Sequence, residues 1–93
     1  MTRPLHERHA LITGAGSGIG AAIALALAQQ GCRLTLMGRS LERLETQAQS
    51  LREQVAQVKV EIVPVDVSDV AQVQSAVAQA QERAGAVHIL INN

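Results

Sequence analysis

The sequence predicts an α/β fold in which the strands of a parallel sheet alternate with helices. Two observations predict it. Four short apolar segments alternate with three longer segments whose apolar residues recur every three or four positions, the period of one helix face. Four of the seven glycines lie between positions 14 and 20, directly after the first apolar segment. Strands that alternate with helices of this length form parallel sheets with right-handed crossovers.

The first half of the chain predicts two strands and two helices. Residues 9–13 form a strand that runs into the glycine cluster, and a small-residue helix follows over residues 19–30 until Gly31 ends it. Residues 32–37 form the second strand. Ser40 is expected to cap a long amphipathic helix, whose apolar positions are Leu41, Leu44, Ala48, Leu51, Val55 and Val58.

The second half predicts the order strand, helix, strand. Residues 58–65 are rich in β-branched side chains and form the third strand. Ser68 is expected to cap the next helix, which Gly85 ends, and residues 87–91 form the fourth strand. The order is therefore β-α-β-α-β-α-β, with residues 1–8 as a polar, solvated lead-in and residues 9–93 as the folded portion.

Composition excludes several classes of function. The 93 residues include no Phe, Tyr or Trp, so the chain lacks the aromatic platforms on which single-stranded nucleic acids stack. The formal net charge is zero, which provides no field to attract DNA or an anionic membrane. No segment resembles a signal peptide, and the longest apolar run is too short to cross a bilayer. We expect a cytoplasmic protein that binds neither nucleic acid nor membrane.

The glycine cluster predicts a dinucleotide-binding turn. A tight strand-to-helix turn needs residues without Cβ crowding, and a helix N-terminus with free N–H groups attracts a pyrophosphate. The pattern G-x-G-x-x-G fails because Ile19 occupies the third glycine position, and a P-loop fails because no lysine follows. The spacing T-G-x-x-x-G-x-G fits at Thr13, Gly14, Gly18 and Gly20. A glycine-rich turn without any ligand is the alternative.

These residues resemble the short-chain dehydrogenase/reductase family. Asp66-Val67 after the third strand is similar to the family's Asp-Val pair at the adenine, and Ile91-Asn92-Asn93 to the start of its N-N-A-G motif. The resemblance implies a Rossmann-type, doubly wound sheet with strand order 3-2-1-4, incomplete relative to the family. Asp66 alone also suits an ordinary turn, and the two asparagines a polar strand end. The cofactor-binding residues that we expect are Gly14, Gly16, Ser17, Gly18, Ile19, Gly20, Arg39, Asp66, Val67, Asn92 and Asn93.

The end of the second strand favours NADP(H) over NAD(H). NAD sites place a carboxylate there to hold the ribose hydroxyls, whereas this chain has Gly38 followed by Arg39. A guanidinium binds the 2′-phosphate of NADP, which a carboxylate would repel. Alternatively, Arg39 stacks on the adenine or lies in solvent.

The resemblance implies hydride transfer that reduces carbonyls or oxidises alcohols, with a catalytic Ser, Tyr and Lys. The chain has no tyrosine, and its only lysine, Lys59, lies at the third strand, so we assign no catalytic residue. We expect the cofactor-binding part, inactive alone, of a longer NADP-dependent enzyme of about 250 residues. That parent would act on a small molecule as a homotetramer or homodimer. The alternatives are a non-catalytic dinucleotide-binding or regulatory module, and a remnant without function.

The remaining titratable residues predict no chemistry. His6 and His9 are expected to be solvated, and His88 to be structural. Histidines without cysteines or carboxylates at ligand spacing do not form a metal site. Cys32 begins a strand that we expect to be buried, so an inert core thiol is its expected state.

Overall fold

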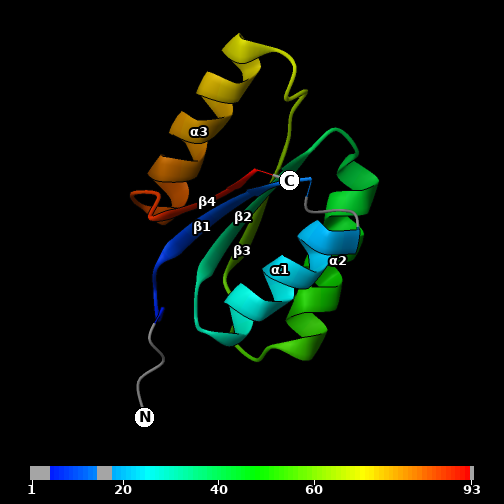
Figure 1. The fold of residues 1–93 in the computed structure, drawn as a ribbon, viewed down its shortest axis with the longest axis vertical. Helices are drawn as coiled ribbons and strands as arrows, with labels where there is room; N and C mark the ends of the chain where they lie inside the picture. Colours follow the sequence, from blue (N-terminus) through cyan, green and yellow to red (C-terminus); the bar gives the residue numbers. More distant parts are fainter. Residues whose placement is uncertain (1–4, 15–17, 93) are drawn as a thin grey trace.

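A computed structural model describes residues 5–14 and 18–92 and confirms the predicted fold class. A parallel sheet with strand order β3-β2-β1-β4 forms the centre (Figure 1). In this order β3 and β4 are the two outermost strands. The elements in chain order are β1 (His9–Thr13), α1 (Gly18–Gln29), β2 (Arg33–Gly38), α2 (Leu41–Gln54), β3 (Val60–Pro64), α3 (Val70–Ala84) and β4 (Ile89–Asn92).

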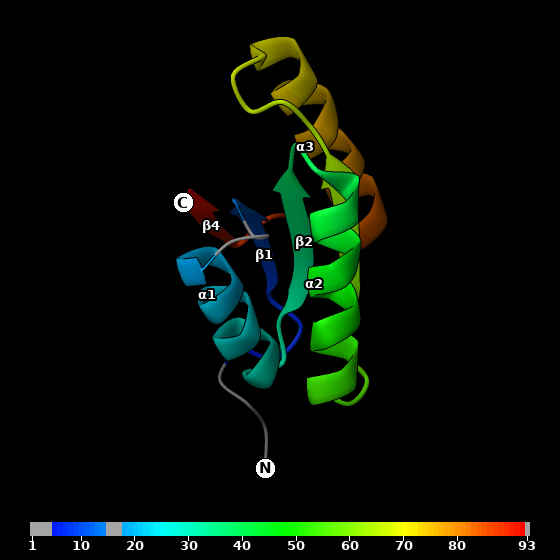
Figure 2. The same ribbon diagram turned by 90° about the vertical axis from the view of Figure 1, so that its right-hand side faces the viewer.

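Helices cover both faces of the sheet, as in a doubly wound fold. Figure 2 shows α1 and α2 on one face and α3 on the other. The larger apolar core lies under α1 and α2, where Ala24 and Ala28 bring α1 close to the strands. A smaller core lies under α3, around Leu11 and Met37. Because β1 and β2 are buried on both faces, they are nearly continuous apolar runs rather than alternating ones.

The strand register brings the carboxyl ends of the strands to one edge of the sheet. Thr13 of β1 is paired with Met37 of β2 and with Asn92 of β4. Gly38, at the end of β2, is paired with Pro64 of β3. The glycine turn and the segments that follow β2 and β3 therefore all begin at this edge, which is where α/β sheets bind ligands.

Helix α2 is shorter than its apolar pattern predicts. The pattern ran to Val58, but the helix ends at Gln54 because Val55 adopts an extended conformation and Gln57 a φ of 63°. Val55 is nevertheless buried, and Val58 packs against the same core. The apolar spacing therefore continues past the helix end because the loop also packs on the sheet.

The predicted N-cap of α3 was wrong by one residue. Asp69, not Ser68, caps the helix, and its carboxylate accepts the backbone N–H of Gln72 at 3.2 Å. Ser68 instead donates its hydroxyl to the Asp66 carboxylate at 2.6 Å. Either side chain is a suitable cap, so composition alone did not separate them. The cap of α2 was predicted correctly, since Ser40 accepts the N–H of Arg43.

The expectation that His9 is solvated was also wrong. Its side chain is 0% exposed, and its Nδ1 and Nε2 lie 2.9 Å from the Gly85 carbonyl oxygen and 2.7 Å from the Thr35 hydroxyl. A carbonyl only accepts, so Nδ1 carries the proton and Nε2 accepts from Thr35. The backbone N–H of His9 donates to His88 Nδ1 at 3.0 Å, which agrees with the structural role expected for His88.

The burial of Cys32 was predicted correctly. Cys32 is 3% exposed, as predicted for a core thiol, and burial raises its pKa above the ordinary value. Among the helices of the described ranges, none combines the length and apolar character needed to cross a membrane.

Candidate functional site

The glycine turn joins β1 to α1 at the carboxyl edge of the sheet. Gly14 has a φ of 65°, a left-handed conformation that glycine adopts without strain, and its N–H donates to the Met37 carbonyl oxygen at 3.1 Å. Gly14 is thereby tied to the end of the neighbouring strand β2. The predicted cofactor residues Gly16 and Ser17 lie outside the described residues.

The N-terminus of α1 is suited to an anion. The helix begins at Gly18, and its first turn contains no acidic residue that would compete with a phosphate. A Cβ built on Gly18 meets no atom within 4 Å, so open space lies beside the first turn. Gly20 is buried towards the sheet, whereas the side chain of Ile19 is 70% exposed. The free N–H groups of such a helix end bind phosphates in dinucleotide folds.

A shallow hollow of about 290 Å³ lies at the ends of β2 and β3. Arg39 and Asp66, two of the predicted site residues, both line it, although 27 positions separate them in the chain. Gln72, from the first turn of α3, lines it as well. Arg39 is exposed and forms no hydrogen bond or ion pair with the described residues, so its guanidinium is free to meet a ligand.

Asp66 has a defined role in the turn after β3. Its Oδ1 accepts the backbone N–H of Ser68 at 3.0 Å and the Ser68 hydroxyl at 2.6 Å. These two hydrogen bonds, with a smaller contribution from the charge of Arg39, hold the pKa of the Asp66 carboxyl below its ordinary value. The carboxylate is therefore charged near neutral pH. Its Oδ2 makes no hydrogen bond to the described part of the chain and is left for a ligand.

Asn92 is tied to the glycine turn. Its Oδ1 accepts the Thr13 hydroxyl at 3.0 Å, and the Ile91 carbonyl oxygen lies 3.4 Å from the same hydroxyl. Two segments 79 residues apart in the chain thus meet where β1 and β4 end. Asn93, also predicted for the site, lies outside the described residues.

Two residues of this edge were not predicted as site residues. Thr13 belongs to the glycine motif but was assigned no contact, and its bond to Asn92 follows from the pairing of β1 with β4. Gln72 accepts the backbone N–H of Asp66 at 3.1 Å and borders the hollow with Arg39. No sequence signal identified Gln72, because only the packing of α3 brings it to this edge.

Val67, which was predicted as a cofactor-binding residue, is 50% exposed beside Asp66.

The described ranges contain no group of three or more His, Cys, Asp or Glu side chains that could hold a metal ion. The donors at this edge are instead a helix N-terminus, a guanidinium and backbone amides, which suit phosphates.

The four-stranded parallel sheet, with helices on both faces and a glycine turn after its first strand, defines a Rossmann-type α/β domain. The family model described as short chain dehydrogenase matches residues 8–93. The chain therefore belongs to the short-chain dehydrogenase family.

Similar proteins agree with this assignment. The chain is 39% identical over 89 residues to an uncharacterised oxidoreductase of Staphylococcus aureus (strain MRSA252), covering 96% of the chain and 37% of that protein. The L-sorbose reductase of Gluconobacter frateurii, complexed with NADPH and L-sorbose, matches with a TM-score of 0.91 and 38% identity, covering 100% of this chain and 35% of that one. An alcohol dehydrogenase from the archaeon Thermococcus sibiricus, complexed with 5-hydroxy-NADP, matches with a TM-score of 0.83 and 41% identity. This match covers 89% of this chain and 35% of the dehydrogenase. The chain thus spans little more than a third of the length of these relatives.

Proposed function

We propose that this chain binds NADP(H) as the cofactor-binding part of an oxidoreductase that reduces carbonyls or oxidises alcohols by hydride transfer. Family membership supports the reaction class. Two similar structures are complexed with NADPH or 5-hydroxy-NADP, which supports the cofactor. The cofactor supplies the hydride, and the residues of this chain bind and orient it.

The observation that carries the cofactor preference is the charge at the end of β2. Gly38 occupies the place where a carboxylate would select NAD, and Arg39 follows it beside the hollow after β3. In this proposal Arg39 binds the 2′-phosphate, Asp66 and Val67 contact the adenine, and Gly14 and the first turn of α1, Gly18 to Gly20, hold the pyrophosphate. Gly16 and Ser17, which are outside the described ranges, and Asn92 with Asn93 complete the proposed set of cofactor contacts.

The test compares the affinities of the chain for NADPH and NADH by calorimetry. We expect NADPH to bind more tightly than NADH. The substitution Arg39→Ala should lower the affinity for NADPH by about tenfold to a hundredfold, because charge-assisted hydrogen bonds contribute about 1.5–3 kcal/mol. Arg39→Ala should leave NADH nearly unchanged. Arg43→Ala, on the exposed face of α2, is the matched control and should change neither affinity. A preference for NADH that Arg39→Ala leaves intact would overturn the assignment.

The remaining parts of the proposal concern the whole enzyme. A small-molecule substrate, a homodimeric or homotetrameric assembly and a cytoplasmic location are proposed from the family. No residue of this chain is proposed to be catalytic. The alternative, a non-catalytic dinucleotide-binding module, rests on the absence of tyrosine from the sequence. An assay of NADPH oxidation with carbonyl substrates separates the two when it is made on the whole protein of which this chain is proposed to be a part, since the module would bind the cofactor without turnover.

A further inference from the structure

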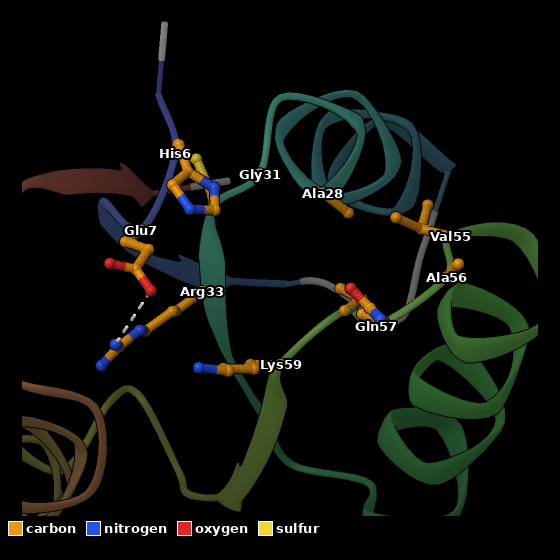
Figure 3. Close-up of a pocket in the computed structure, with 11 residues that line it drawn as sticks. His6, Glu7, Ala28, Gly31, Arg33, Val55, Ala56, Gln57 and Lys59 are labelled. Carbon is orange, nitrogen blue, oxygen red and sulfur yellow. Dashed lines mark ion pairs between the residues drawn. The ribbon is translucent and has the colours of Figure 1, made fainter. Parts of the chain in front are cut away.

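A larger cavity lies at the opposite edge of the sheet, at the amino ends of the strands. Its volume is about 610 Å³, which falls within the range of small-molecule sites. Figure 3 shows it between the segment before β1, the end of α1, the start of β2 and the loop from α2 to β3. Its residues are separate from those of the glycine turn and of the hollow beside Arg39.

Two cationic side chains border this cavity. In Figure 3, the side chains of Arg33, at the start of β2, and of Lys59, just before β3, extend in the same direction. Lys59 is exposed, and its ammonium forms no hydrogen bond or ion pair with the described residues. Arg33 has one weak ion pair, 3.7 Å from its guanidinium to the Glu7 carboxylate, and its buried Nε has no hydrogen-bond partner in the described ranges. Both cations therefore retain unused donors.

The surrounding charge is positive although the chain as a whole is neutral. Arg33 and Lys59 also line an adjoining hollow of about 290 Å³, together with Arg52 and Arg83. Among the described residues, two carboxylates line the two spaces: Glu7, which pairs with Arg33 at 3.7 Å, and Glu61, which pairs with Arg83 at 3.8 Å. Four basic and two acidic side chains leave a local charge of +2, which attracts anions.

The backbone around the cavity is also unusual. Glu7 and Gln57 are the two non-glycine residues with positive φ in the described ranges, at 62° and 63°, and both line the cavity. Residues held in such conformations are concentrated at ligand-binding sites. Ala28 and Val55 also line the cavity, but both are buried in the core, at 1% and 6% exposed. The groups that the cavity offers to a ligand are therefore mainly its cations.

We propose that this cavity binds a small organic phosphate, with Arg33 and Lys59 on the phosphate. A guanidinium and an ammonium are the usual protein partners of a phosphate, the first through paired donors and the second as a point charge. Glu7 competes with the ligand for Arg33. The site is independent of the dinucleotide site, since the two lie at opposite ends of the strands.

The test is an NMR titration of the chain with phenyl phosphate, in which amide chemical shifts locate the binding. We expect saturable shifts at Gly31, Gln57 and Lys59. Benzyl alcohol, which lacks the charge, should cause no such shifts. If the shifts are confined to the glycine turn and Arg39, or if benzoate binds as tightly as phenyl phosphate, the proposal is wrong.

Three variants with a control sharpen the test. Lys59→Gln and Arg33→Gln should each lower the affinity for phenyl phosphate about tenfold, as expected for the loss of one charge-assisted contact. Glu7→Gln should strengthen binding, because it frees Arg33, whereas a purely structural role for Glu7 predicts no gain. Arg43→Gln should leave the affinity unchanged. Unaltered affinity in Lys59→Gln, an exposed site where the fold is not at risk, would overturn the proposal.

Discussion

The proposed preference for NADP(H) rests on single residues at the end of β2. Gly38 has an ordinary backbone conformation, and a Cβ built on it lies 3.5 Å from the Leu44 side chain, which is normal van der Waals contact. The fold therefore accepts a side chain at the position where NAD-binding proteins carry a carboxylate. The turn would therefore have room for a carboxylate side chain at position 38, and its absence there is not a steric requirement.

Gly38→Asp is expected to reverse the cofactor preference. The new carboxylate would repel the 2′-phosphate and accept hydrogen bonds from the ribose hydroxyls. The affinity for NADPH should therefore fall, and the affinity for NADH rise, each by about tenfold. Calorimetric titration with both cofactors measures the change. Gly38→Asn, nearly equal in size but uncharged, is the control and should weaken NADPH less.

The hydrogen bonds to Asp66 predict a dependence of stability on pH. Since the folded state lowers the pKa of Asp66, it gains stability that is present above the ordinary pKa of about 4 and is lost as the pH falls through the lowered value. Ser68→Ala removes the hydroxyl bond and should raise the pKa of Asp66 part of the way back. A carboxyl NMR titration measures this pKa. An unchanged value in Ser68→Ala would mean that the 2.6 Å bond does not form in solution.

At the scale of elements, His9 joins three parts of the fold. It begins β1, its Nε2 accepts from Thr35 of β2, and its Nδ1 donates to Gly85, which ends α3. Its backbone N–H reaches His88, just before β4. These contacts lie between segments up to 79 residues apart, so local sequence patterns do not contain them.

Thr35→Val should therefore destabilise the chain by about 1–3 kcal/mol, because the buried Nε2 of His9 loses its hydrogen bond to the Thr35 hydroxyl. Thr46→Val, on the exposed face of α2, is the matched control and should change the free energy of unfolding by about 0.5 kcal/mol or less. Urea denaturation measures both variants. Equal effects of the two would show that the His9 contact adds nothing to stability.

At the scale of the whole molecule, the sheet is covered unevenly. Leu11 of β1 is 2% exposed, whereas Leu90, its partner on β4, is 66% exposed. Helix α3 contacts β2 and β3 on this face, and the exposure of Leu90 shows that the outer strand β4 is covered less. An apolar outer strand of this kind promotes association between chains.

Leu90→Lys is expected to reduce self-association while leaving stability within about 0.5 kcal/mol, because the side chain is already in solvent. Sedimentation at several concentrations measures association. Ile91→Lys is the contrasting variant, since Ile91 packs against the core on the opposite face and its replacement should lower stability. Undiminished association of Leu90→Lys would show that β4 is not the contact.

The order of strands and helices, the glycine turn and the burial of Cys32 were predicted from sequence, because glycine spacing and apolar periodicity are local properties of the chain. The cofactor roles of Arg39, Asp66 and Asn92 remain predictions, although the structure brings Arg39 and Asp66 to one hollow. Tertiary structure alone decided the burial of His9, the choice of Asp69 over Ser68 as cap, and the placement of Arg33 and Lys59 at one cavity. The physical reason is strand pairing: a parallel register aligns the ends of strands far apart in sequence, and no local pattern specifies which side chains then meet.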